Sequence, residues 1–339
     1  MIKEAIGTLV SNDSLTFEQA ATVMEEIMSG EATPAQIAAF VTALRIKGET
    51  VDEIAGLASV MRDRAVPVQA TPPLVDTCGT GGDSSASVNI STAAAFIAAG
   101  AGLSVAKHGN RAMSSHCGSA DVLEALGVII DLDASAVAQC LEKIGIGFMF
   151  APIFHPAMKH AAGPRREIGI RTVFNILGPL TNPAHAESQV IGVPSEEVGK
   201  KIALVLHRLG TKHSLVVHGT DGMDEITISG KSLVWEVNKD GVQPAYEVTP
   251  LYFGFEEASL ADIQGDTPED NARTLRHILA GEDRGPKREV VVMNAAAALV
   301  AGNLAANLKE GARLAESSID GGQALAKLDA LVEFSQSLD

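Results

Sequence analysis

The amino-acid sequence predicts an α/β protein, with a small N-terminal helical domain and a larger α/β domain whose central mixed, mostly parallel sheet is wrapped by helices. Three capped helix starts lie in the first 66 residues, and short apolar strands alternate with helices in the rest of the chain. The composition agrees, because 46% of the residues are hydrophobic but only 4% are aromatic. This composition is typical of helices packed closely on a sheet.

The first domain begins with three helix starts of the same kind. Thr16, Thr33 and Thr50 each stand three residues before a glutamine or a glutamate, and this pairing forms a capping box. Apolar residues recur after each start at the spacing of one helix face. Residues that stop a helix follow the three segments in turn, namely Gly30, Gly48 and Pro67.

A proline-containing connection over residues 66–73 separates the helical segment from a different kind of structure. Residues 155–182 lack strand signals, so this section either returns to the helical domain or crosses between the two domains. The expected domains are a small one over residues 1–70, joined by helices from about residues 160–187, and a large one over residues 71–159 and 188–339.

Short apolar runs after the connection indicate the strands of the sheet. A helix is predicted to begin near Ser91, between the first two of these runs. Strands that alternate with helices in this way favour a parallel or mixed sheet. The predicted strands cover residues 74–75, 103–106, 188–193, 214–217 and 290–293.

The chain is acidic, with a formal net charge of -16 and a pI near 5.0. This charge repels polyanions and argues against nucleic acid or an acidic membrane surface as a partner. Two basic stretches depart from the trend, so they indicate a local site for an anionic ligand unless they are solvated surface charge. Their members are Lys107, His108, Arg111 and His116, then Lys159, His160, Arg165, Arg166 and Arg171.

The three cysteines, Cys78, Cys117 and Cys140, are odd in number and lack the Cys-x-x-Cys spacing, which is typical of a reducing compartment. Residues 1–13 are too polar for the apolar core of a signal peptide. The longest apolar runs are broken by glycine or asparagine before they reach the length of a membrane span. We therefore expect a cytoplasmic protein without a membrane segment.

The segment DTCGTGGD, residues 76–83, is the first of four groups that indicate chemistry. Its three glycines, Gly79, Gly81 and Gly82, allow backbone N–H groups to approach a ligand. The helix that follows adds unsatisfied N–H donors and the positive end of its dipole. These features predict a phosphate-binding loop, with a tight turn whose glycines serve geometry alone as the alternative.

The segment KHGNRAMSS, residues 107–115, follows a predicted strand that ends at Ala106. Ligands bind at the carboxyl ends of strands in such a sheet, and this segment offers a cation, an amide, a guanidinium and two hydroxyls. Residues 118–121 then begin a helix that adds another N-terminal donor. The segment is a second candidate for phosphate binding, with an exposed polar loop as the alternative.

The other two groups are acidic and basic. Asp224 and Glu225 are adjacent carboxylates in a glycine-containing turn, where they converge on a cation such as Mg²⁺ or remain solvated surface charge. Arg165, Arg166 and Arg171 offer planar guanidinium groups suited to a carboxylate ligand, with salt bridging through Glu167 as the alternative for at least one of them. In combination with the two loops, these groups indicate a phosphorylated sugar with a metal-bound leaving group.

The order of seven segments, GTGGD, NIST, KHGNRAMSS, GSAD, RREIGIRT, LGPLTNP and HGTDGMDE, resembles the anthranilate phosphoribosyltransferase family along nearly the whole chain. The resemblance implies a nucleoside phosphorylase/phosphoribosyltransferase-like fold and a homodimer. It also implies transfer of the phosphoribosyl group of 5-phosphoribosyl 1-pyrophosphate (PRPP) to the amine of anthranilate, with Mg²⁺, in tryptophan biosynthesis.

The same resemblance implies a role for single residues. Ser91, Asp224 and Glu225 match the family's Mg²⁺ ligands. The residues that match its PRPP site are Gly79, Gly82, Asp83, Ser87, Asn89, Ile90, Ser91, Thr92, Lys107, His108, Gly109, Asn110, Arg111, Ala112, Met113, Ser114, Ser115 and Ser119.

Gly79, Asn110 and Arg165 match the family's contacts to anthranilate, and Arg165 is the expected partner of the carboxylate. Position 87 is more often threonine in the family, and Ser87 keeps the hydroxyl. Residues 116–117 are a variable spot to which the resemblance gives no role.

The implied reaction does not require a strong general base, because the aromatic amine of anthranilate is already neutral near pH 7. Catalysis would come from positioning and from charge stabilisation by Mg²⁺, Lys107 and loop N–H groups. Two other functions stay open on sequence alone. One is a pyrimidine nucleoside phosphorylase, and the other is a non-catalytic relative that binds nucleic acid.

Overall fold

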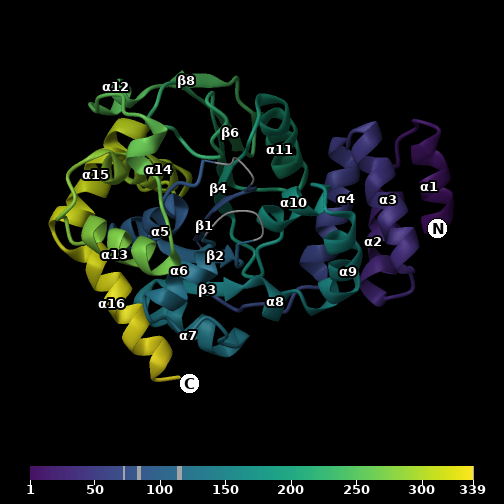
Figure 1. The fold of residues 1–339 in the computed structure, drawn as a ribbon, viewed down its shortest axis with the longest axis horizontal. Helices are drawn as coiled ribbons and strands as arrows, with labels where there is room; N and C mark the ends of the chain where they lie inside the picture. Colours follow the sequence, from purple (N-terminus) through teal and green to yellow (C-terminus); the bar gives the residue numbers. More distant parts are fainter. Residues whose placement is uncertain (72, 82–84, 113–116, 339) are drawn as a thin grey trace.

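The computed structural model describes residues 1–71, 73–81, 85–112 and 117–338. Its first four helices form a unit at one end of the molecule, far from the C-terminal helices (Figure 1). Three of these helices carry the predicted capping boxes. The four helices are α1 (Ile2–Val10), α2 (Phe17–Ser29), α3 (Pro34–Lys47) and α4 (Val51–Asp63).

Helix α1 was not among the predicted helix starts. Its N-cap is Met1, whose side chain makes no capping hydrogen bond, so the sequence holds no capping signal there. The N-terminal ammonium instead lies 3.2 Å from Oε1 of Glu26 on α2.

The described residues form an eight-stranded sheet with the order β3-β2-β1-β4-β5-β6-β7, and β8 pairs with β6. The pairings from β3 to β5 are parallel, whereas those of β6 are antiparallel. The predicted fold class is therefore confirmed. The strands are β1 (Leu74–Gly79), β2 (Ser104–Gly109), β3 (Ile146–Phe150), β4 (Ser188–Gly192), β5 (His213–Gly219), β6 (Ser232–Asn238), β7 (Gly241–Val242) and β8 (Tyr246–Val248).

Helices cover both faces of the sheet, and no helix in the described part of the chain is both long and apolar enough to span a membrane. Helix α5 (Ile90–Gly100) packs with α14 (Pro286–Ala301) on one face, while α11 (Glu196–Arg208) packs on β6 and on α4 (Figure 1). The other α-helices are α6 (Ser119–Ala125), α7 (Ala134–Ile144), α8 (Ala151–Phe154), α9 (Lys159–Ile168), α10 (Phe174–Leu177), α12 (Pro250–Phe253), α13 (Pro268–Leu279), α15 (Leu308–Asp320) and α16 (Gln323–Gln336). The 3-10 helices are η1 (Pro156–Met158), η2 (Gly178–Leu180) and η3 (Leu260–Ile263).

The strand predicted at residues 290–293 was wrong, because these residues lie inside α14. Because this helix is buried between α5 and α15, it has apolar residues on all of its faces. A short, wholly apolar run does not distinguish a buried strand from a buried helix. The proline at the start of the helix, Pro286, was the available signal for a helix.

Two strands extend further than predicted. Strand β1 continues to Gly79, and β2 continues through Lys107 and His108 to Gly109. Lys107 and His108 were expected in a loop, but they lie in a strand and are buried. The prediction followed runs of apolar residues, so it ended the strand before these two polar side chains.

Helix α9 lies against α2 and α3, although it follows β3 in the chain. Its buried Ala161 belongs to the same apolar cluster as the cores of α2, α3 and α4. The chain therefore returns to the helical unit after three strands of the sheet.

Candidate active site

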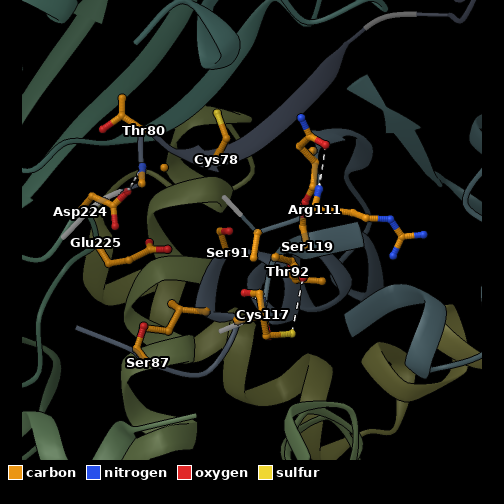
Figure 2. Close-up of a pocket in the computed structure, with 18 of the residues that line it drawn as sticks. Cys78, Thr80, Ser87, Ser91, Thr92, Arg111, Cys117, Ser119, Asp224 and Glu225 are labelled. Atoms are coloured by element: carbon orange, nitrogen blue, oxygen red, sulfur yellow. Dashed lines mark hydrogen bonds between the residues drawn. The ribbon is translucent and has the colours of Figure 1, made fainter. Parts of the chain in front are cut away.

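The carboxyl ends of β1, β2 and β5 meet around a cavity of 340 Å³. Its walls come from the glycine loop after β1, the first turn of α5, the end of β2 and the acidic turn after β5. Figure 2 shows the side chains of Ser91, Asp224 and Glu225 in this region. The predicted residues that line the cavity are Gly79, Ser87, Asn89, Ile90, Ser91, Thr92, Lys107, His108, Gly109, Asn110, Arg111, Ala112, Ser119, Arg165, Asp224 and Glu225. Gly82, Asp83, Met113, Ser114 and Ser115 lie outside the described residues.

The glycine loop and the acidic turn are in direct contact. The backbone N–H of Gly81 donates to Oδ2 of Asp224 at 2.6 Å. A Cβ at Gly79 would lie 2.2 Å from the same oxygen, and a Cβ at Gly192 would lie 1.6 Å from the carbonyl oxygen of Asp224. These glycines are required because any side chain there would push the acidic turn away from the loop.

Lys107 is a buried cation beside the glycine loop, with a relative exposure of 3%. Its Nζ donates to the carbonyl of Thr77 at 2.6 Å and lies 3.4 Å from Oγ of Ser91. Burial lowers the pKa of Lys107, while the negative charge of Asp76 acts in the opposite direction. Lys107 thus places positive charge at the floor of the cavity, next to the first turn of α5.

Asp76, for which no role was predicted, is fully buried below this site. Its Oδ1 accepts the N–H of His108, and its Oδ2 accepts Nδ2 of Asn182 at 2.7 Å. Burial raises the pKa of the Asp76 carboxyl, and the charge of Lys107 opposes that rise. Asp76 and Asn182 connect β1, β2 and the segment after η2. No local sequence pattern predicts these contacts.

The first turn of α5 presents hydroxyl and backbone donors to the cavity. Thr92 is buried, and its Oγ1 has no hydrogen-bond partner among the described residues. Asn89 does not cap the helix; its Nδ2 donates to the carbonyl of Cys117 at 3.1 Å. The N–H groups at this helix start therefore have no side-chain cap from Asn89, and a helix start of this kind attracts anions.

The side chain of Arg111 forms ion pairs with carboxylates of the protein. Its guanidinium pairs with Asp121 at 3.0 Å and with Glu124 at 2.8 Å. Figure 2 shows the side chain extending away from Ser91, Asp224 and Glu225. The backbone of Arg111 lines the cavity, while its charge is directed at α6.

A second cavity, of 460 Å³, lies beside the first. It is lined mostly by apolar groups, with His108 and His155 among the polar exceptions. The residues that line both cavities include Gly79, Asn110 and Arg165, which are the three residues expected to contact anthranilate. The guanidinium of Arg165 lies 5.1 Å from the ring centre of Phe174, and burial lowers the pKa of Arg165.

The two histidines of this cavity form a buried pair with ring centres 5.0 Å apart. Burial lowers the pKa of His108 to about 3 and that of His155 to about 4. Nε2 of His108 and both ring nitrogens of His155 have no hydrogen-bond partner among the described residues. Both rings are therefore neutral at pH 7.

The histidine pair is expected to make the free energy of unfolding depend on pH. An unfolded histidine gains a proton near pH 6.5, whereas these two gain it near 3 and 4 in the folded protein. The unfolded state therefore binds more protons between these values, so stability is present above pH 6.5 and is lost as the pH falls. Urea denaturation from neutral to mildly acidic pH measures this loss.

The double variant His108→Gln, His155→Gln should lose part of this pH dependence. His277→Gln is the matched control, because His277 is exposed. An unchanged pH dependence in the double variant would contradict the assignment to the buried pair.

A metal site fits the acidic turn only with help from other ligands. Among the described residues, no three His, Cys, Asp or Glu side chains gather closely enough to hold a metal ion by themselves. Mg²⁺ is suited to such a place, because it is usually held by one or two carboxylates together with water and substrate phosphates. Asp224 and Glu225 are such carboxylates, and both line the cavity.

Comparison with known proteins identifies the family. The model described as "Glycosyl transferase family, helical bundle domain" matches residues 3–65, and "Glycosyl transferase family, a/b domain" matches residues 71–325. A protein from Dehalococcoides mccartyi named anthranilate phosphoribosyltransferase is 58% identical over 339 residues, which cover 100% of this chain and 99% of that protein. The chain belongs to the anthranilate phosphoribosyltransferase family.

Solved structures of anthranilate phosphoribosyltransferases agree with this membership. The structure from Thermus thermophilus has a TM-score of 0.93 and 44% identity, and the match covers 98% of this chain and 99% of that one. The structure from Saccharomyces cerevisiae in complex with PRPP and Mg has a TM-score of 0.91 and 30% identity, with 99% and 98% covered. The yeast enzyme was also solved in complex with 4-fluoroanthranilate.

Proposed function

We infer that the chain transfers the phosphoribosyl group of PRPP to the amine of anthranilate, giving N-(5-phosphoribosyl)anthranilate and pyrophosphate in tryptophan biosynthesis. The observation that carries this function is a polar cavity and a largely apolar cavity with a common wall. The polar cavity suits a phosphorylated sugar, and the apolar one suits an aromatic ring. The common wall brings the two substrates together.

PRPP binds in the polar cavity, between the glycine loop, the first turn of α5 and the end of β2. Lys107, the hydroxyls of Ser91 and Thr92 and the start of α5 attract the phosphates. Asp224, Glu225 and Ser91 would hold Mg²⁺, as the resemblance implies. When bound, Mg²⁺ supplies positive charge for the departing pyrophosphate. The yeast relative, which was solved with PRPP and Mg, supports this proposal.

Catalysis consists of positioning and charge stabilisation rather than proton transfer by a side chain. The amine of anthranilate is neutral near pH 7, so no strong base is required. His108 is a weak base, because burial lowers its pKa to about 3. Lys107 instead stabilises the negative charge that develops on the leaving group, and the common wall holds the amine near the sugar.

Arg165 binds the carboxylate of anthranilate in this proposal. Arg165→Ala is expected to raise the KM for anthranilate roughly 10- to 100-fold, which is the loss expected for a charged hydrogen bond. The KM for PRPP should stay nearly constant. Steady-state kinetics with each substrate varied in turn measures both values.

Arg166→Ala is the matched control, because it removes the same side chain from an exposed neighbouring position. An equal loss of affinity for both substrates in Arg165→Ala would count against a specific contact with anthranilate.

The proposed reaction is tested directly by the loss of anthranilate fluorescence. Consumption of anthranilate should require both PRPP and Mg²⁺. Folded protein that consumes no anthranilate under these conditions would overturn the proposed function. Replacement of PRPP by inorganic phosphate and a nucleoside tests the phosphorylase reaction, and we expect no turnover there.

We also propose that the protein is a cytoplasmic homodimer and that α9 belongs to the small domain. Two exposed apolar residues of the helical unit, Val10 at 73% and Ile46 at 82%, support a contact between two copies at α1 and α3. The contacts of α9 with α2 and α3 support the domain assignment over about residues 160–187. The three unpaired cysteines suit a reducing compartment.

A further inference from the structure

Asp121, in the first turn of α6, joins the two described ends of the segment that follows β2. Its Oδ2 accepts the N–H of Ala112 at 2.9 Å and the N–H of Gly118 at 2.9 Å. Its Oδ1 accepts Nη1 of Arg111 at 3.0 Å. One carboxylate thus receives three hydrogen bonds from residues that all line the polar cavity.

The position of this carboxylate requires an explanation, because a negative charge beside a phosphate site repels the substrate. Burial by itself would raise the pKa of Asp121, but hydrogen bonds from Ala112, Gly118 and Arg111 outweigh it and the pKa is lowered. Asp121 is therefore ionised at neutral pH. Two N–H groups and one guanidinium compensate its charge, so the cavity keeps its attraction for anions.

Arg111 is part of this compensation. Its guanidinium contacts Asp121 and Glu124 in the same arrangement, with Nη2 3.0 Å from Oε1 of Glu124. The side chain extends away from Ser91, Asp224 and Glu225 (Figure 2). The guanidinium of Arg111 therefore pairs with two carboxylates of the protein, Asp121 and Glu124.

Asn110 is held by other contacts. Its carbonyl accepts the N–H of Ala120 at 3.2 Å and Oγ of Ser119 at 3.3 Å. Loss of the Asp121 carboxylate would leave these bonds in place and release Ala112 and Gly118. Ala112 and Gly118, which line the polar cavity, would then move. Asn110, in the wall common to the two cavities, would keep its position.

We propose that Asp121 is a positioning residue for PRPP, and that the Arg111 side chain acts through Asp121 rather than on the phosphates. This inference rests on the proposed function and deepens it, since it names what holds Ala112 and Gly118 in place beside the polar cavity. Asp121 is not among the residues that line either cavity. It sets the positions of Ala112 and Gly118 and keeps the cation of Arg111 at α6.

The first test is Asp121→Asn, which preserves the size of the side chain but replaces one acceptor oxygen by an NH₂ group. The KM for PRPP should rise about tenfold, as expected when the part-buried N–H groups of Ala112 and Gly118 and the guanidinium of Arg111 lose a charged acceptor. The KM for anthranilate should change little. Glu124→Gln is the matched control, because it weakens the other contact of Arg111 and leaves both N–H bonds of Asp121 intact; its KM for PRPP should stay near that of the wild type.

The second test uses Asp121→Glu, which restores a carboxylate at a position where glutamate caps helices. This variant should recover most of the affinity for PRPP, and it carries the test if Asp121→Asn does not fold. Circular dichroism and the thermal transition show whether each variant is folded. A folded Asp121→Asn with the KM for PRPP of the wild type, or an Asp121→Glu with no recovery, would overturn the positioning role.

The third test combines Asp121→Asn with Arg111→Met. If Arg111 acts through Asp121, the affinity of the double variant for PRPP should be no lower than that of whichever single variant binds PRPP less tightly. Losses that multiply would show that Arg111 contacts the phosphates independently and would overturn that half of the proposal. An inactive wild-type protein would instead refute the proposed function, so the two failures are distinguishable.

Discussion

Replacing Asp224 by Asn and Glu225 by Gln together is expected to lower kcat at least about 100-fold, even at saturating Mg²⁺. The double variant loses the two carboxylates that face the polar cavity after β5. It also weakens the acceptor of the Gly81 N–H, so the glycine loop loses a contact with the acidic turn. The charge of the departing pyrophosphate would then be stabilised by Lys107, by the hydroxyls of Ser91 and Thr92 and by backbone donors, without the metal.

Stopped assays of anthranilate consumption across a range of Mg²⁺ concentrations measure this effect. The matched control is Glu282→Gln with Asp283→Asn, because this pair is also adjacent and acidic but lies in the turn before α14. Both double variants change the net charge equally. If the Asp224, Glu225 variant is folded and turns over at the rate of the wild type, the metal-binding role is wrong.

Lys107→Met should reduce kcat/KM for PRPP about 100-fold and also destabilise the fold by about 3 kcal/mol. The catalytic loss follows from the removal of the cation at the floor of the cavity. The structural loss arises because Asp76, fully buried nearby, loses the positive charge that opposes its neutralisation. A buried carboxylate without a cation is costly.

The pH dependence separates these two effects. The pKa of Asp76 is already raised in the folded protein, and removal of Lys107 should raise it further. A carboxyl with a raised pKa is destabilising when ionised, so its penalty is absent at low pH and appears as the pH rises. The difference in free energy of unfolding between Lys107→Met and wild type should therefore shrink as the pH is lowered.

Urea denaturation and steady-state kinetics of the same preparations measure the two losses. Lys327→Met is the matched control, since Lys327 is half-buried and donates to the carbonyl of Ile144 away from the active site. Equal destabilisation by both substitutions would show that Asp76 has no special dependence on Lys107.

The helices of the N-terminal unit could be predicted because their signals are local. Thr16, Thr33 and Thr50 each bond to a residue three positions away, so the sequence alone contains both partners. The start of α6 near Ser119 and the acidic turn after β5 were predicted for the same reason. The two phosphate segments also stand at the carboxyl ends of their strands, as expected.

The rest depends on contacts between distant segments. Asp76 and Asn182 are 106 positions apart, and the sequence near either residue does not predict their hydrogen bond. The run at residues 290–293 is apolar because α14 is buried on every side, and such a run has no period that would distinguish a helix from a strand. Lys107 and His108 are polar residues of a buried strand, so a pattern based on apolar residues ended β2 too early.

The position of α9 limits how the helical unit can move relative to the sheet. The chain passes between the two parts near residues 64–73, again around η1 and once more after α9. A body attached by one tether can rotate about any axis, whereas a body attached at several separate points has a restricted range of rotation. Any change in the relative position of the two parts would alter the space around Arg165, which α9 itself carries to the common wall of the cavities.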